Sequence, residues 1–169
     1  MNLDPNNAEI FFNRALVYRK TGDQQRAIAD FDRAIELNSR DVRYFFGRAL
    51  FLLAQRQYAF AVADLDKAIA LDDKNAMYRY FRGVANNNQK RYDVAIADFN
   101  AALKVKPKWD SAFLARGLAY SGQGDHPRAR RDLRQCLRVT TNDETRRQAQ
   151  DALQRLREGE YLPSIINTQ

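Results

Sequence analysis

Four arginines and four aspartates recur along the chain in pairs whose members are sixteen residues apart. The pairs are Arg14 and Asp30, Arg48 and Asp64, Arg82 and Asp98, and Arg116 and Asp132. A carboxylate could act as a general acid or base, but four identical copies of one pair favour a structural role over a single catalytic centre. A bidentate arginine–carboxylate pair fixes helix register more than it adds stability. We therefore expect each pair to meet between helices, partly buried, within a repeat or across the join to the next.

Other residues with catalytic or metal-binding potential are few. His126 is the only histidine and Cys136 is the only cysteine, so the chain forms neither an internal disulfide nor a cysteine-based metal cluster. The sequence contains no glycine-rich phosphate loop, no metal-ligand spacing and no nucleophile–histidine–acid set. We therefore expect a protein that is not an enzyme and that uses no cofactor and no metal.

The ion-pair spacing recurs because the whole sequence recurs every 34 residues, in copies that begin at residues 8, 42, 76 and 110. Three positions of each copy hold a small residue. They are position 8 (Ala15, Ala49, Gly83, Gly117), position 20 (Ala27, Ala61, Ala95, Ala129) and position 27 (Ala34, Ala68, Ala102, Cys136). Small residues at matching points of two helices let their backbones approach closely. A period in this range indicates a solenoid, in which each unit buries its apolar face against its neighbours.

These small positions, together with an aromatic residue at position 4, resemble the pattern of the tetratricopeptide repeat (TPR) family. The aromatic residues are Phe11, Phe45 and Phe113. The proline that the family carries at position 32 is present as Pro107. The resemblance covers residues 8–143 and departs from the family pattern at Arg79 and Asn86 of the third copy. It implies an all-α fold, a right-handed superhelical solenoid of antiparallel helix pairs, and a role as a protein-interaction scaffold or adaptor.

The repeats determine the expected domain organisation. We expect a lead-in over residues 1–7, TPR units over 8–41, 42–75, 76–109 and 110–143, a capping helix over 144–158 and a tail over 159–169. Each unit predicts two helices, the first over 8–21, 42–55, 76–89 or 110–122 and the second over 24–37, 58–71, 92–105 or 127–139. Ala149, Ala152, Leu153 and Leu156 share one face of the last segment, which is typical of a helix that caps the final repeat.

The composition is that of a folded protein, with 45% hydrophobic residues, four prolines and seven glycines. No stretch of about 18 apolar residues is present, so the sequence predicts no membrane span. The early residues do not show the basic start and long apolar core of a signal peptide, so the sequence predicts none. The first residues, MNLDPNN, resemble the end of a TPR unit, which suggests a fragment of a longer protein. The compartment therefore stays open, with the cytoplasm as the default and the periplasm compatible with a fragment.

One face of each first helix is the predicted partner-binding site. On a helical wheel, positions 4, 8 and 11 face the paired helix, whereas positions 2, 5, 9, 12 and 13 share the face that lines a concave groove in TPR proteins. This second face is apolar here, and contiguous exposed apolar surface usually marks a binding site. We expect it to bind an apolar or amphipathic peptide segment, although superhelical twist could instead pack it against adjacent first helices. The candidate groove residues, with one neighbour at position 6, are Phe12, Asn13, Leu16, Arg43, Phe46, Leu50, Leu53, Met77, Tyr80, Val84, Asn87, Leu114 and Leu118.

A first alternative is a partial carboxylate clamp that holds the acidic C-terminal tails of chaperones. Some TPR adaptors use lysine, asparagine and arginine on successive first helices for this purpose. Asn13 matches the asparagine of such a clamp, and Arg43 matches a basic position on the next helix. The second basic position of that helix is Gly47 in this chain, so the clamp is incomplete.

A second alternative is RNA or DNA binding by the third and fourth repeats. Residues 76–109 contain seven basic and two acidic residues, whereas residues 8–41 contain six of each. Basic residues near an aromatic side chain can hold phosphate and stack on a base. The candidates are Lys104, Lys106, Lys108, Trp109, Arg128, Arg130, Arg131, Arg134 and Arg138. Acidic residues are interleaved with them, which favours an ordinary solvated surface, so nucleic acid is the less favoured partner.

Two further segments could mediate contacts between proteins. The N-terminal end, at Phe11 and Phe12, has no upstream repeat in this sequence and could self-associate. The tail is short and apolar over residues 161–166 and could fold back on the solenoid or dock on a neighbour.

Overall fold

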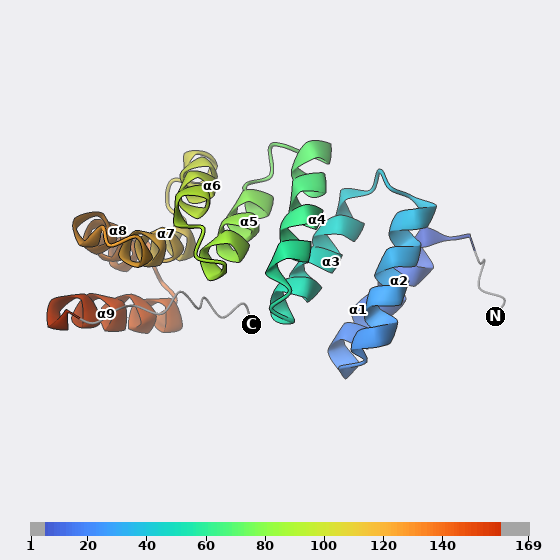
Figure 1. Ribbon diagram of the computed structural model, residues 1–169, viewed down its shortest axis with the longest axis horizontal. Coiled ribbons are helices and arrows are strands. Elements are labelled where there is room, and N and C mark those ends of the chain that lie inside the picture. The colour runs from blue at the N-terminus through green and yellow to red at the C-terminus, as the bar shows by residue number, and fades with distance from the viewer. Residues whose placement is uncertain (1–5, 160–169) are drawn as a thin grey trace. The chain divides into compact units, whose positions relative to one another are not determined.

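The computed structural model describes residues 6–159, and within them the chain forms nine α-helices and no strand (Figure 1). The helices are α1 (Ala8–Thr21), α2 (Gln24–Leu37), α3 (Val42–Ala54), α4 (Tyr58–Leu71), α5 (Ala76–Asn88), α6 (Tyr92–Val105), α7 (Asp110–Gly122), α8 (His126–Val139) and α9 (Asp143–Glu158). The predicted all-α fold class is thereby confirmed. No helix of the described residues is long and apolar enough to cross a membrane.

Polar caps explain where several helices begin. The side chains of Asn7, Asp23 and Asp41 each accept a hydrogen bond from a backbone N–H in the first turn of α1, α2 and α3. Such a cap satisfies one of the backbone donors that a helix leaves unpaired at its N-terminus. Asn75 caps α5 and Asp125 caps α8 in the same way.

The turn inside each repeat places one residue in the left-handed region. Gly22 and Gly124 occupy this position with φ of 81° and 87°. Arg56 and Lys90 occupy the equivalent position of the second and third copies with φ of 58° and 61°. Glycine adopts this conformation without strain, whereas a side chain makes it costly. The break between helices is thus readable from Gly–Asp in two copies and has no glycine signal in the other two.

The chain divides into two compact units, residues 1–74 with α1–α4 and residues 75–169 with α5–α9. In the first unit, α1 packs against α2, α3 packs against α4, and α2 packs against α3. The small residues that share the repeat register, such as Ala15, Ala27 and Ala49, are fully buried there, beside Phe31 and Leu65. The small residues therefore let the helices approach, and the large ones fill the remaining space.

The second unit has one continuous core. α5 pairs with α6 and α7 with α8, and α6 packs against α7. Phe99, Leu133 and Cys136 are fully buried within this core. α9 packs on α7 and α8, lies beside α8 in Figure 1, and buries Ala149 and Leu156. The predicted tail, apart from Gly159, lies outside the described residues.

Candidate functional site

Each of the four arginine–aspartate pairs is joined in the structure. In every repeat the arginine Nε and Nη2 donate to the two carboxylate oxygens of the aspartate sixteen residues later, over 2.6 to 3.0 Å. The aspartate side chains are only 5 to 9% exposed. The arginine comes from the first helix and the aspartate from the second, so each pair links the two helices of one repeat.

In two of these pairs the arginine also donates a hydrogen bond to a side chain of the preceding repeat, a contact that the sequence had not predicted. Nη1 of Arg48 donates to Asp32 over 2.5 Å, and Nη1 of Arg116 donates to Asn100 over 2.6 Å. Asp32 and Asn100 both occupy position 25, directly after the buried aromatic residue of the second helix. The signal was present, because position 25 of the first three copies is Asp32, Asp66 and Asn100.

The predicted groove row is only partly accessible. Its half-buried or exposed members are Phe12, Asn13, Leu16, Arg43, Phe46, Leu50, Met77 and Leu118. Its buried members, whose side chains are not accessible to a partner, are Leu53, Tyr80, Val84, Asn87 and Leu114. The prediction that these five line an open groove is therefore corrected.

Tyr80 shows why part of the row is buried. Its ring packs against Phe81, Phe99 and Trp109 at centroid distances of 5.1, 6.0 and 4.5 Å. Burial, and to a smaller extent the charge of Asp110, raises the pKa of Tyr80 to about 12. The helical wheel assigned this side chain to the groove face, whereas in the structure its ring packs on Phe99 of the paired helix α6 and on Trp109.

Phe12 is also held inside its own unit. Its ring lies 5.0 Å from that of Tyr44 and 6.0 Å from that of Phe31, measured between centroids. A Cβ atom placed on Gly47 would lie 2.7 Å from the Phe12 ring. Gly47 is therefore a glycine because Phe12 occupies the space of its side chain. A basic residue at this position, as a carboxylate clamp requires, would displace that ring.

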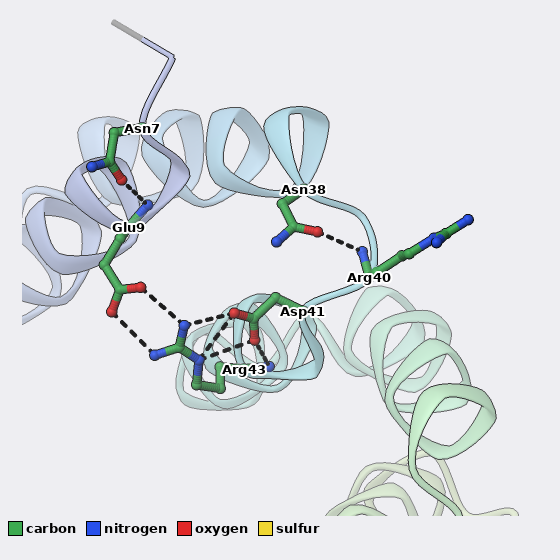
Figure 2. A network of polar contacts seen from close by, with 6 residues as sticks. All are labelled: Asn7, Glu9, Asn38, Arg40, Asp41 and Arg43. Carbon is green, nitrogen blue, oxygen red and sulfur yellow. Dashed lines mark hydrogen bonds and ion pairs between the residues drawn. The ribbon is translucent and has the colours of Figure 1, made fainter. Parts of the chain in front are cut away.

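Arg43 is engaged in a polar network at the start of α3 (Figure 2). Its guanidinium donates to both carboxylate oxygens of Glu9 on α1, over 3.0 and 3.1 Å, and to Asp41, the N-cap of α3. The hydrogen bond from Arg43 lowers the pKa of Asp41. An acidic ligand at Arg43 would have to compete with two carboxylates of the chain itself, which argues against the clamp.

An open hollow of about 620 Å³ lies in the second unit, beside the start of α5 and the loop between α6 and α7. It is lined by Met77, Lys106, Pro107, Lys108 and Trp109. Nζ of Lys106 lies 4.9 Å from the centroid of the half-buried Trp109 ring. No ion pair of Lys106 or Lys108 forms within the described residues. The hollow is thus lined by three apolar residues and by two exposed lysines that form no ion pair in the described part of the chain.

Three tetratricopeptide repeat models match the chain, over residues 8–41, 46–112 and 111–142. The chain belongs to the tetratricopeptide repeat family. Among solved structures, a crystal structure of MamA protein is similar to this TPR chain, with 24% sequence identity and a TM-score of 0.75. The alignment covers 80% of this chain and 74% of the MamA chain. A second crystal structure of MamA has 23% sequence identity and a TM-score of 0.75, and the alignment covers 88% of this chain and 83% of the MamA chain.

A third solved structure, MamA 41-end from Desulfovibrio magneticus RS-1, is 21% identical with a TM-score of 0.75 and covers 79% of this chain and 76% of its own. These similarities show the fold alone. No curated protein matches the chain in sequence. Its TPR repeats and fold support a role as a scaffold for protein–protein interaction.

Two of the arginines of α8 in this TPR chain already have partners within the chain. Arg128 pairs with Asp125 over 2.5 Å, and Arg130 donates to the backbone carbonyl of Leu156 over 2.8 Å. Arg131, Arg134 and Arg138 are exposed. In the described residues no group of three or more histidine, cysteine, aspartate or glutamate side chains could hold a metal ion.

Proposed function

We propose that this TPR chain is a protein-interaction module that binds an acidic, amphipathic segment of a partner protein in the hollow around Trp109. The observation that carries this proposal is that one hollow is lined both by the apolar residues Met77, Pro107 and Trp109 and by Lys106 and Lys108. Apolar surface supplies binding energy, and the lysine charges select an acidic partner.

The distribution of charge supports an acidic partner. The third repeat, residues 76–109, contains seven basic and two acidic residues. Lys104, Lys106 and Lys108 are all exposed around the end of α6. A segment with carboxylates beside an aromatic or aliphatic side chain would place that side chain against Trp109 and its charges near the lysines.

The hollow includes only part of the first-helix row that the sequence predicted as a binding groove. Met77 belongs both to the predicted first-helix row and to the hollow, whereas Tyr80 and Val84 of the same helix are buried. The partner segment therefore contacts the N-terminal end of α5, beside the loop that precedes α7. In the first unit, Leu16 and Leu50 of the predicted row are half-buried.

The test is a fluorescence-anisotropy titration of the whole chain with labelled twelve-residue peptides. One peptide carries four glutamates and a central Trp–Leu pair, a second replaces that pair with serines, and a third replaces the glutamates with lysines. We expect the first to bind at least about tenfold more tightly than the others, since both the apolar and the charged contacts are needed.

A matched pair of variants locates the site. Lys106→Glu with Lys108→Glu changes two exposed charges at the hollow, and Arg19→Glu with Lys20→Glu changes two exposed charges on α1. The first variant should lose at least about tenfold in affinity and the second should keep it. Equal loss in both would contradict the site and leave only general charge attraction.

Nucleic acid is the second candidate, because lysines beside Trp109 could also hold phosphate and stack on a base. A labelled single-stranded DNA of twelve nucleotides belongs in the same titration. The DNA could bind more tightly than the acidic amphipathic peptide and lose this binding in the Lys106→Glu, Lys108→Glu variant. That result would identify nucleic acid, and not a protein segment, as the ligand of the hollow.

A further inference from the structure

Two adjoining hollows form one groove in the first unit, between α2, α3 and α4. Their volumes are about 310 and 280 Å³, and Ile28, Leu52 and Gln57 line both. Phe60 of α4 lines the larger hollow and is 68% exposed, more than any other large apolar side chain of the described residues. The groove therefore presents apolar surface to water between elements that all belong to residues 1–74.

Glutamines make up four of the seven residues that line the smaller hollow. Gln24 and Gln25 come from α2, and Gln55 and Gln57 come from the loop between α3 and α4. Within residues 6–159, none of these four side-chain amides takes part in a hydrogen bond. Each amide offers an N–H donor and a carbonyl acceptor, which are the groups that a peptide bond also offers. The smaller hollow is thus suited to the uncharged backbone of another chain.

The equivalent residues of the second unit contact one another instead. Tyr92 stands at the repeat position of Gln24, and a Cβ atom placed on Gly122 would lie 2.5 Å from its ring. Asp93 accepts a hydrogen bond from the side chain of Gln123 over 2.5 Å, and both stand at repeat positions that hold glutamines in the first unit. In the second unit the chain itself thus supplies a ring and a carboxylate acceptor where the first unit presents amides.

The charged residues that line the larger hollow are two aspartates and one arginine, so they sum to one negative charge. The guanidinium of Arg48 donates to both Asp64 and Asp32. The side chain of Asp64 is only 6% exposed, whereas that of Asp32 is 48% exposed and accepts from Arg48 through one of its two oxygens. Asp32 can therefore accept a further hydrogen bond from a cation that enters the groove.

The spacing along α2 fixes the length of the occupant. Gln24, Ile28 and Asp32 are four residues apart on one face of the helix, over a length of about 12 Å. An extended chain of about four residues covers this length, and its side chains two positions apart point to the same side.

We propose that this groove binds an extended segment of a partner protein in which an aromatic residue and an arginine stand two positions apart. The aromatic ring packs on Phe60 and Ile28, and the guanidinium binds Asp32. The glutamine amides pair with the backbone of the segment. This segment is basic, whereas the segment proposed for the hollow around Trp109 is acidic, and neither proposal depends on the other.

The probe is a fluorescein-labelled peptide, Ser-Thr-Ser-Phe-Thr-Arg-Ser-Thr-Ser, whose polar flanks allow binding in either direction. Three matched peptides replace the phenylalanine with serine, replace the arginine with glutamate, or carry N-methyl groups on the flanking peptide bonds, which removes their N–H donors. Anisotropy titration of the whole chain should show binding of the probe. Each matched peptide should bind at least about tenfold more weakly, since each lacks one of the three kinds of contact.

A matched pair of variants assigns the binding to the groove. Phe60→Ser removes the exposed ring, and Val94→Ser makes the same change at the same repeat position of α6, where Val94 is 49% exposed. The first variant should lose at least about tenfold in affinity for the probe, and the second should keep it. Circular dichroism should stay unchanged in both, because both side chains are exposed.

A second pair closes the groove with side chains that the chain already uses. Gln24→Tyr with Ala54→Gly copies Tyr92 and Gly122 into the same two repeat positions of the first unit. This double variant should lose at least about tenfold in affinity, and Ala54→Gly alone should keep it. Equal affinity of the four peptides, or full binding by Phe60→Ser or by the double variant, would overturn the proposal. Reversible dimerisation without peptide that Phe60→Ser abolishes would overturn it too, in favour of a second copy of the chain.

Discussion

At the scale of single residues, the turn inside each repeat imposes the same backbone conformation on very different side chains. Gly22 and Arg56 both have a positive φ, 81° and 58°, although only glycine adopts this region without strain. The repeat therefore has a preferred residue at this position, and two of its four copies lack it.

This difference predicts the sign of two substitutions. Gly22→Ala should destabilise the chain by about 1 kcal/mol, because the new side chain is strained at positive φ. Arg56→Gly should stabilise it by up to about 1 kcal/mol, since the removed strain outweighs the added freedom of the unfolded chain. Urea denaturation followed by circular dichroism measures both. A destabilised Arg56→Gly variant would show that contacts of the arginine side chain outweigh its backbone strain.

The single cysteine gives a second prediction at this scale. Cys136 is fully buried, and desolvation raises the pKa of its thiol to about 11. Because the thiolate is the reactive form, Cys136 should resist iodoacetamide in the folded protein at pH 8 and react once urea unfolds the chain. Mass spectrometry of the alkylated protein reads this directly. Rapid alkylation of the folded chain at pH 8 would contradict the buried, protonated thiol.

The same shift has a consequence for stability. A thiol whose folded-state pKa lies above its unfolded value favours folding at low pH and loses that contribution as pH rises from about 8.5 to about 11. Wild type should therefore lose stability across this window, and Cys136→Ala should show a smaller loss. Alanine is the natural comparison, because position 27 is Ala34, Ala68 and Ala102 in the other repeats. An identical slope in both proteins would assign the loss to other groups.

At the scale of helices, the arginine at position 7 connects elements more extensively than its spacing indicates. Arg48 on α3 reaches Asp64 on α4 and Asp32 on α2, so one guanidinium links three helices. Within residues 6–159, the guanidinium of Arg14 on α1 donates hydrogen bonds only to Asp30 on α2. The contribution of this arginine should therefore depend on whether a second acceptor at position 25 is within its reach.

Alanine substitution tests this dependence. Arg48→Ala leaves the buried Asp64 without its partner and should cost about 3 kcal/mol. Arg14→Ala removes a more exposed arginine with one acceptor and should cost roughly half as much. Arg40→Ala, an exposed arginine whose side chain makes no ion pair in the described residues, serves as the control with an expected change within about 0.5 kcal/mol. Equal losses for Arg14 and Arg48 in urea titrations would refute the role of the second acceptor.

The same network explains how the repeat pattern ends. Position 25 of the fourth copy is Arg134, and the residue sixteen positions later, in α9, is Gln150 rather than arginine. α9 still packs on α8 as α7 packs on α6, but it does so without the arginine–acid link. At the join between α8 and α9, both the acidic or amide residue at position 25 and the arginine sixteen residues later are absent. Gln150 at the second position avoids placing an arginine against Arg134.

Helices and ion pairs were predictable because they depend on residue type and spacing. Small residues every 34 positions and Gly–Asp breaks placed α1 at the residues where the structure has it, and the constant sixteen-residue separation indicated which arginine meets which aspartate. The accessible part of the binding face was not predictable in the same way. Phe46 and Tyr80 share one repeat position, yet Phe46 is half-buried and Tyr80 is buried beneath Trp109 and Phe99. Depth depends on neighbours from other elements, which a helical wheel omits.

At the scale of the whole molecule, charge is divided unequally between the two units. Residues 1–74 contain eleven basic and eleven acidic residues, whereas residues 75–169 contain seventeen basic and ten acidic residues. The whole formal net charge of +7 therefore lies in the unit that contains the Trp109 hollow. Long-range attraction of an acidic partner should consequently act on this unit.

This division predicts how salt affects the interaction proposed at the hollow. The association rate of the acidic Trp–Leu peptide, measured by stopped flow, should fall about tenfold between 0.05 and 0.5 M NaCl, because the Debye length shortens from roughly 14 to 4 Å and screens the lysines. In the Lys106→Glu, Lys108→Glu variant this dependence should weaken, whereas in the Arg19→Glu, Lys20→Glu variant it should stay close to that of the wild type. Equal salt dependence in the two variants would mean that overall charge, and not the hollow, governs the encounter.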